Sequence, residues 1–163
     1  MPTIRHRTGG RWDPREDACY FLANSMETIQ WAVGRAKHQL VAVNEINGDK
    51  ALDTLKGYVA NGDSLLIDSG VFHLANDHAK RNNLPLEKAL ALAPDAIDGF
   101  DELFAAYCRI VTSLKDDCWG YIEIDQGGRD NKIKTRAKLE ALGLRPIPVY
   151  HPLNDGWDYF DEL

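Results

Sequence analysis

Short apolar runs alternate with longer stretches of helical periodicity along most of the chain. The β-rich runs are residues 18–23, 39–43, 64–67, 118–124 and 146–150. The clearest helical stretch is residues 100–114, where Leu103, Tyr107, Ile110 and Leu114 recur three or four positions apart on one face. This alternation predicts βα units and a mainly parallel sheet.

Polar and turn-forming residues set the expected limits of the other helices. Ser25 is a suitable N-cap for a helix that runs to about residue 37. Asn82, Asn83 and Pro85 interrupt residues 71–93, so we expect an inserted loop or two short helices there. Further helices are expected at residues 50–60 and 132–142, with opening helical turns at 155–163.

These elements predict the α/β fold class, as a parallel (β/α) barrel of TIM type. We expect the barrel to be incomplete, with about five βα units in residues 18–163, after an N-terminal extension at residues 1–17. A closed eight-stranded barrel takes about 250 residues, so a truncated or split barrel and a smaller open sheet are the two alternatives.

Composition narrows the classes of function. No apolar stretch approaches the roughly 20 residues of a membrane helix, and the arginine-containing N-terminus lacks the apolar centre of a secretory signal. We therefore expect a cytoplasmic protein with no membrane partner. The net charge of −6 disfavours indiscriminate binding to a phosphate backbone. Cys19, Cys108 and Cys118 lack C-x-x-C spacing, so we expect free thiols rather than disulfides or a zinc site.

One basic strip remains a candidate for local nucleic-acid contact. Its members are Arg129, Lys132, Lys134, Arg136 and Lys138. A solvated helix face is the favoured interpretation on charge pattern alone.

Polar side chains stand at the end of every expected strand, which is where parallel α/β proteins bind ligands. They are Asn24, Asn44 with Glu45, Asp68 with Ser69, Asp125 with Gln126, and His151. Such residues are also common helix caps and turn formers. The functional interpretation is strongest for Asp68 and Asp125, because each directly follows an apolar run and precedes a glycine within three residues.

Two of these segments resemble a known family. The run Asp68-Ser-Gly-Val-Phe-His73 resembles the Asp-Ser-Gly-Gly-aromatic-Gln motif of tRNA-guanine transglycosylases. Arg145-Pro-Ile-Pro-Val-Tyr-His151 is similar to a strand of the smaller, phage-associated relatives that insert 7-deazaguanine bases into DNA. With the acidic strand between them, the resemblance covers roughly residues 18–163.

The resemblance implies a pentosyltransferase-like protein that recognises guanine or a 7-deazaguanine base for exchange in DNA or tRNA. It makes Asp68 the general acid/base, Phe72 a stacking platform and Asp125 the acceptor for the Watson–Crick edge. The base-binding set that it implies is Ser69, Gly70, Phe72, Asp125, Gln126 and His151. These roles are chemically consistent, because a carboxylate can accept two N–H bonds from a guanine edge while an aromatic face holds the ring.

The sequence departs from the family pattern at several places. Val71 replaces the second glycine and His73 the glutamine. The family's nucleophilic aspartate and zinc cysteines belong to segments that would follow Leu163, so we expect no zinc or other cofactor in this chain. One alternative is therefore a non-catalytic base-binding or interaction module. A further alternative is a small metal-dependent TIM-like hydrolase that uses Asp68, Asp125 and His151 as ligands.

An incomplete barrel also implies a partner. Its open edges and unpaired sheet face favour a homo-oligomer or a second chain that completes the barrel. We expect Tyr150, Trp157, Tyr159 and Phe160 near that contact.

Overall fold

Four parallel strands form a sheet whose order follows the chain. The computed structural model describes residues 21–23, 25–27, 29, 37–151 and 155–163. The strands are β1 (Leu22–Ala23), β2 (His38–Ala42), β3 (Ser64–Asp68) and β4 (Gly120–Tyr121). Each pairs in parallel with the next. The predicted α/β class with a parallel sheet is confirmed.

Six α-helices and two 3₁₀ turns lie within the described residues. The helices are α2 (Gly48–Ala60), α3 (Val71–Asn82), α4 (Leu86–Ala91), α5 (Phe100–Leu114), α6 (Gly128–Ala141) and α7 (Trp157–Glu162). The 3₁₀ turns are η1 (Val43–Glu45) and η2 (Pro94–Ala96). Among the helices so described, none is both long enough and apolar enough to cross a membrane.

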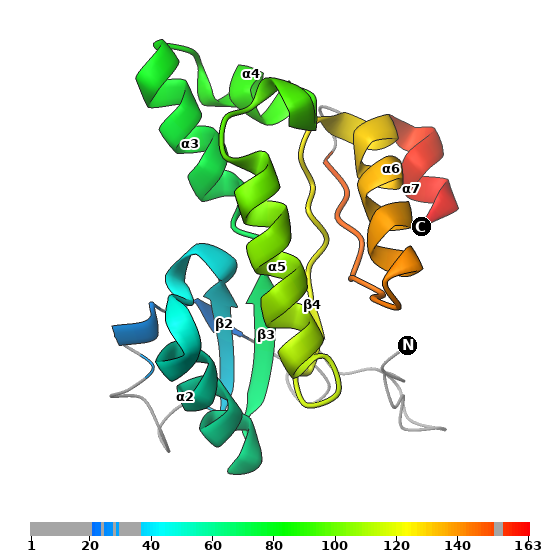
Figure 1. Ribbon diagram of the computed structural model, residues 1–163. Helices are drawn as coiled ribbons and strands as arrows, with labels where there is room; N and C mark the ends of the chain where they lie inside the picture. The colour runs from blue at the N-terminus through cyan, green and yellow to red at the C-terminus, as the bar shows by residue number, and fades with distance from the viewer. Residues whose placement is uncertain (1–20, 24, 28, 30–36, 152–154) are drawn as a thin grey trace.

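Helices α2 and α5 cover one face of the sheet (Figure 1). The register places Val41 of β2 opposite Ile67 of β3, and Ile67 opposite Tyr121 of β4, so these three side chains share a face. All three are buried, Val41 and Ile67 completely, and they belong to the core cluster that includes Leu55 of α2 and Ile110 of α5. Burial of these apolar side chains is the main force that holds the two layers together.

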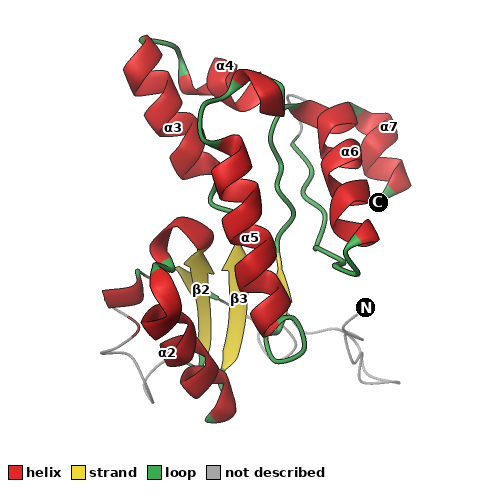
Figure 2. Ribbon diagram, viewed as in Figure 1, coloured by secondary structure: helices red, strands yellow, loops and turns green. Residues whose placement is uncertain are grey.

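The segment 71–93 forms two helices, as one of the two expected arrangements had it. Helix α3 ends at Asn82, and Asn83 adopts a left-handed conformation with φ 51° that stops the helix. Pro85 then stands at the N-cap of α4. Figure 2 shows that the arrowheads of β2 and β3 point toward α3 and α4, which therefore lie beyond the carboxyl ends of these strands.

The expected fifth strand is much reduced. Residues 146–150 meet the sheet through one isolated parallel bridge between Ile122 and Ile147. Ile147 N donates to Tyr121 O at 2.7 Å, and Glu123 N donates to Ile147 O at 2.9 Å. The next N–H groups on this side of the segment bond side chains instead of the strand backbone: Arg145 N donates to the Tyr121 hydroxyl at 2.7 Å, and Val149 N donates to Glu123 Oε1 at 2.6 Å, so the ladder stops at one bridge.

The first expected βα unit falls largely outside the described residues. Of the expected strand 18–23, the structure describes the part that contains β1, and most of the expected helix after Ser25 is not described. The proposed extension at residues 1–17 and the side chains of Asn24 and Cys19 also lie outside the described residues.

Candidate functional site

The end of β3 forms a tight turn that leads into α3. Gly70 N donates to Asp68 Oδ2 at 3.1 Å, and Val71 N donates to Ser69 Oγ at 3.4 Å. Gly70 has φ 79°, a left-handed conformation that favours glycine, and a Cβ there would lie 3.0 Å from Asn44 Oδ1. The turn therefore fixes two polar side chains, those of Asp68 and Ser69, at the carboxyl end of a buried strand.

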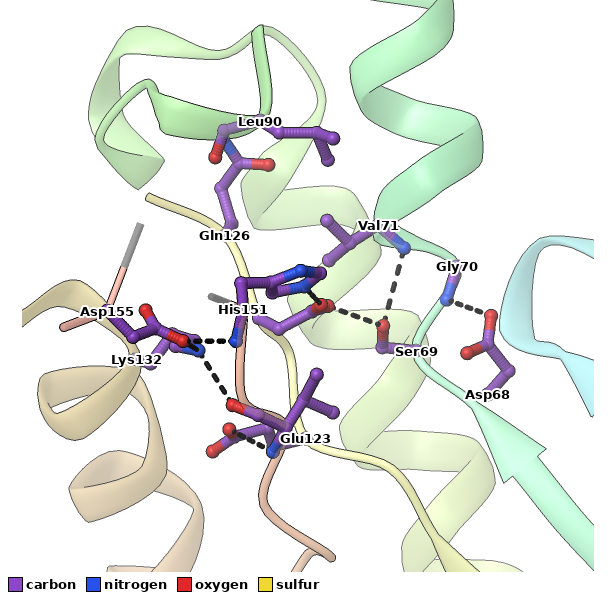
Figure 3. Close-up of polar contacts among 12 residues, drawn as sticks. Asp68, Ser69, Gly70, Val71, Leu90, Glu123, Gln126, Lys132, His151 and Asp155 are labelled. Atoms are coloured by element: carbon purple, nitrogen blue, oxygen red, sulfur yellow. Dashed lines mark hydrogen bonds and ion pairs between the residues drawn. The ribbon is translucent and has the colours of Figure 1, made fainter. Parts of the chain in front are cut away.

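Two sequence-predicted site residues, His151 and Ser69, bond to a third, Asp125. His151 Nε2 lies 2.6 Å from Asp125 Oδ2, and Ser69 Oγ donates to Asp125 Oδ1 at 3.4 Å (Figure 3). An ionised carboxylate can only accept hydrogen bonds, so when Asp125 is ionised His151 Nε2 is the donor in this pair. The His151 side chain is 40% exposed and that of Asp125 16%. Solvent thus reaches a pair that is otherwise fixed by its neighbours.

Asp68 lies close enough to this pair to be affected by its charge. Burial raises the pKa of the Asp68 carboxyl above its ordinary value, and the negative charge of Asp125 raises it further. The hydrogen bond from Gly70 N acts in the opposite direction without cancelling the increase. Figure 3 shows Asp68 directed at Gly70, on the side of the turn opposite Ser69, so its carboxyl responds to the charge of Asp125 without bonding to the pair.

Gln126 does not join this group. Its side chain is fully buried, and Nε2 lies 2.8 Å from both Ala89 O and Leu92 O and 3.2 Å from Leu90 O. Figure 3 shows Gln126 directed toward Leu90. These carbonyls belong to the end of α4, where Ala89 O and Leu90 O also accept from Leu92 N and Gly127 N. Gln126 thus caps a helix in this structure, a role that the motif comparison did not indicate.

Phe72 and Gly70 lie near the group without contacting Asp125. Phe72 stands in the first turn of α3 with 64% of its surface exposed. Gly70 lines an open cavity of about 370 Å³ between η1, α3 and α5, together with Asn44. Asp68 and Asp125 do not line this cavity. The cavity is therefore separate from the expected carboxylate site.

A buried ion pair holds the backbone of the segment that carries His151. Lys132 of α6 is fully buried, forms an ion pair with Asp155 and donates to Val149 O at 2.7 Å. Asp155 Oδ2 also accepts from His151 N at 2.6 Å. The residue before His151 in this chain segment, Tyr150, packs its ring against Phe160 at 5.2 Å between centroids. Side chains of α6 and the C-terminal segment therefore fix the backbone from which His151 projects.

The interpretation of the basic strip as a solvated face is wrong for two of its members. Arg136 Nε donates to Glu123 Oε2 at 2.8 Å, and its guanidinium also bonds the Tyr159 hydroxyl. Glu123 is buried and accepts from Val149 N at 2.6 Å, yet burial still raises its pKa. Lys132 and Arg136 are one turn apart, so both face the acids of the interior.

Tyr159, which we expected near a contact with a partner chain, is buried. It is 1% exposed and packs under the cations of α6, with Lys132 Nζ 5.0 Å from its ring centroid. Tyr159 is therefore part of the interior, whereas Trp157 and Phe160 are 74% and 55% exposed.

Within the residues that the structure describes, no three His, Cys, Asp or Glu side chains are placed to hold a metal ion. No protein-family model, curated protein or solved structure matches the sequence.

Proposed function

We propose that the chain is a transglycosylase-like protein, a partial (β/α) barrel of TIM type that recognises guanine or a 7-deazaguanine base of DNA or tRNA. The observation that supports this proposal is the group at the strand ends: Asp125 held by His151 and Ser69, close enough to Asp68 for its charge to raise the Asp68 pKa. This group coincides with the segments that resemble the transglycosylase family.

Asp125 is chemically equipped for a guanine edge. An ionised carboxylate offers about four lone-pair sites, and Ser69 and His151 occupy one on each oxygen. The remaining sites can accept the two adjacent N–H groups of guanine. His151 Nδ1 adds an acceptor, and Asp68, whose pKa is raised, can supply or remove a proton at the base.

Base recognition is common to two candidate functions, exchange of the base and binding without exchange. Calorimetry with guanine and 7-deazaguanine tests recognition first. We expect binding by the wild type and a loss of about 1–3 kcal/mol in Asp125→Asn, because an amide presents a donor where the base needs an acceptor. Asp117→Asn, on an exposed turn after α5, is the matched control and should bind as the wild type does.

The second step separates the two functions. Incorporation of labelled base into DNA or tRNA supports exchange, and binding without incorporation supports a binding module. Failure of the wild type to bind either base at any pH between about 5 and 8 would remove base recognition from this chain.

A further inference from the structure

The same tripeptide, Asn-Gly-Asp, stands at both ends of α2. Residues 47–49 contain the N-cap and the first turn of the helix, and residues 61–63 begin at its C-cap. The asparagine and the glycine are exposed to solvent at both places. Asparagine before glycine is chemically labile, because glycine has no Cβ to obstruct the approach of its backbone nitrogen to the asparagine side chain. A difference in reactivity between these matched tripeptides would therefore come from their structural surroundings.

The reaction at such a pair releases ammonia. The glycine nitrogen attacks Cγ of the asparagine, a new N–Cγ bond closes a succinimide ring, and the Cγ–Nδ2 bond breaks. The proton of the glycine N–H leaves with the side-chain NH₂ group as ammonia. Water then opens the ring at one of its two carbonyl groups and leaves aspartate or isoaspartate. Water is the only co-reactant, and nothing is oxidised or reduced.

The structure leaves the attacking nitrogen free at the start of α2. Gly48 is the first residue of the helix, where backbone N–H groups have no intrahelical acceptor. Within the described residues, Gly48 N donates no hydrogen bond to the backbone, and the Asn47 side chain does not cap the helix. Asn47 Nδ2 makes one long contact at the surface, 3.4 Å from Asn44 O. A Cβ on Gly48 would meet no atom within 4 Å, so the space beside this residue is open.

The structure holds the corresponding nitrogen at the end of α2. Gly62 N donates to Val59 O at 2.9 Å, which closes the turn after the helix. Closure of the succinimide requires Gly62 N to lose its proton and to leave Val59 O, so this hydrogen bond must break first. One backbone hydrogen bond slows such a step about fivefold, the equivalent of about 1 kcal/mol.

We propose that Asn47 is a site of spontaneous deamidation in the folded protein and that Asn61 is protected from it. The product carries a new negative charge at the start of α2, where the helix dipole favours an anion. It also places that charge at the open cavity between η1, α3 and α5, which Asn47 and Gly48 both line. The modification needs no enzyme or cofactor and does not depend on the proposed function.

Peptide mapping by mass spectrometry tests the inference on the full chain incubated in mildly alkaline buffer. The peptide that contains Asn47 should convert at least about fivefold faster than the peptide that contains Asn61. Enzymatic methylation of isoaspartate identifies the ring-opened product at the same position. In urea the two sites should react at similar rates, because the tripeptides match and the turn at Gly62 is lost.

Two serine variants serve as matched controls. Asn47→Ser keeps a residue suited to the N-cap and should abolish the faster reaction. Asn61→Ser should leave the rate at Asn47 unchanged. Equal rates at the two sites of the folded chain, or faster conversion at Asn61, would overturn the inference. A difference that persists unchanged in urea would also overturn it, as would an Asn47 that stays intact in the folded chain while the unfolded chain reacts.

Discussion

Replacement of Asp155 by asparagine tests how the backbone at His151 is held. The Asp155 carboxylate forms the ion pair with fully buried Lys132 and accepts from His151 N. Asparagine keeps the size of the side chain and removes its charge. The Lys132 ammonium then retains Val149 O and the face of the Tyr159 ring but loses the only carboxylate with which it forms an ion pair among the described residues, while Glu123 acts on it only through longer-range charge. The new amide also places a donor where Asp155 Oδ1 now lies buried without a partner among the described residues.

The expected cost is large for a chain of this size. Loss of one member of a buried ion pair costs about 3–5 kcal/mol, because the other charge stays buried. Domains are stable by about 5–15 kcal/mol in total. At about 2–4 °C per kcal/mol, the melting temperature should fall by roughly 6–20 °C. The control is Asp130→Asn, which breaks an exposed pair with Arg129 at 3.6 Å and should cost under about 1 kcal/mol.

Urea unfolding followed by tryptophan fluorescence gives the free energy, and circular dichroism gives the melting temperature. The double variant Lys132→Met with Asp155→Asn should recover a large part of the loss, because it leaves no charge buried alone. A cost for Asp155→Asn no greater than that for Asp130→Asn would show that water reaches the pair in solution. In that case the argument that buried charge holds the His151 segment would be wrong.

Three further predictions concern other parts of the chain. Because the folded-state pKa of Asp68 is raised above its ordinary value of 3.8, ionisation of Asp68 lowers the stability as the pH rises above 3.8. Asp68→Asn should therefore raise the melting temperature near pH 7 and leave it unchanged well below pH 3.8. An equal effect at all pH values contradicts this prediction. Gln126→Leu should cost about 1–3 kcal/mol in urea unfolding, because Leu92 O at the end of α4 loses its donor while Ala89 O and Leu90 O keep backbone donors; a neutral effect would mean that water caps Leu92 O. We expect the chain to associate through exposed Trp157 and Phe160, with loss of association in Trp157→Asp by light scattering; a monodisperse wild-type monomer at high concentration refutes this.

The sequence predicts helices best where apolar residues recur on one face along the whole length of the helix. Helix α5 begins and ends where the spacing of Leu103, Tyr107 and Ile110 places it, because each of these side chains packs into the core. The segment 146–150 was harder to predict. Its apolar residues indicate a strand, but the N–H groups of Arg145 and Val149 bond the side chains of Tyr121 and Glu123, so pairing is reduced to one bridge.

Part of the candidate site could also be predicted, namely the part that depends on residues adjacent in the chain. The turn of Asp68 and Ser69 depends on neighbouring residues in the chain, so sequence pattern alone locates it. The backbone at His151 is held through the ion pair between Lys132 and Asp155, two residues that stand 23 positions apart in the sequence. One signal was present, because Lys132 shares a helix face with Leu139, which is fully buried. A lysine on the buried face of a helix requires an acid elsewhere in the chain as its partner.

Because residues 146–150 meet the sheet through a single bridge at Ile147, the His151 side of the site is held by different interactions from the Asp68 side. Asp68 and Ser69 follow a strand hydrogen-bonded to neighbours on both sides, whereas His151 follows a segment fixed chiefly by side chains of α6. Cooperative units of this kind open independently of one another. Backbone amides of β3 should therefore exchange with solvent only when the sheet unfolds, and those of Val149 and His151 at a lower free energy. The site can then lose its imidazole while Asp68 and Ser69 at the end of β3 remain in place, so the 146–151 segment can open without loss of the sheet.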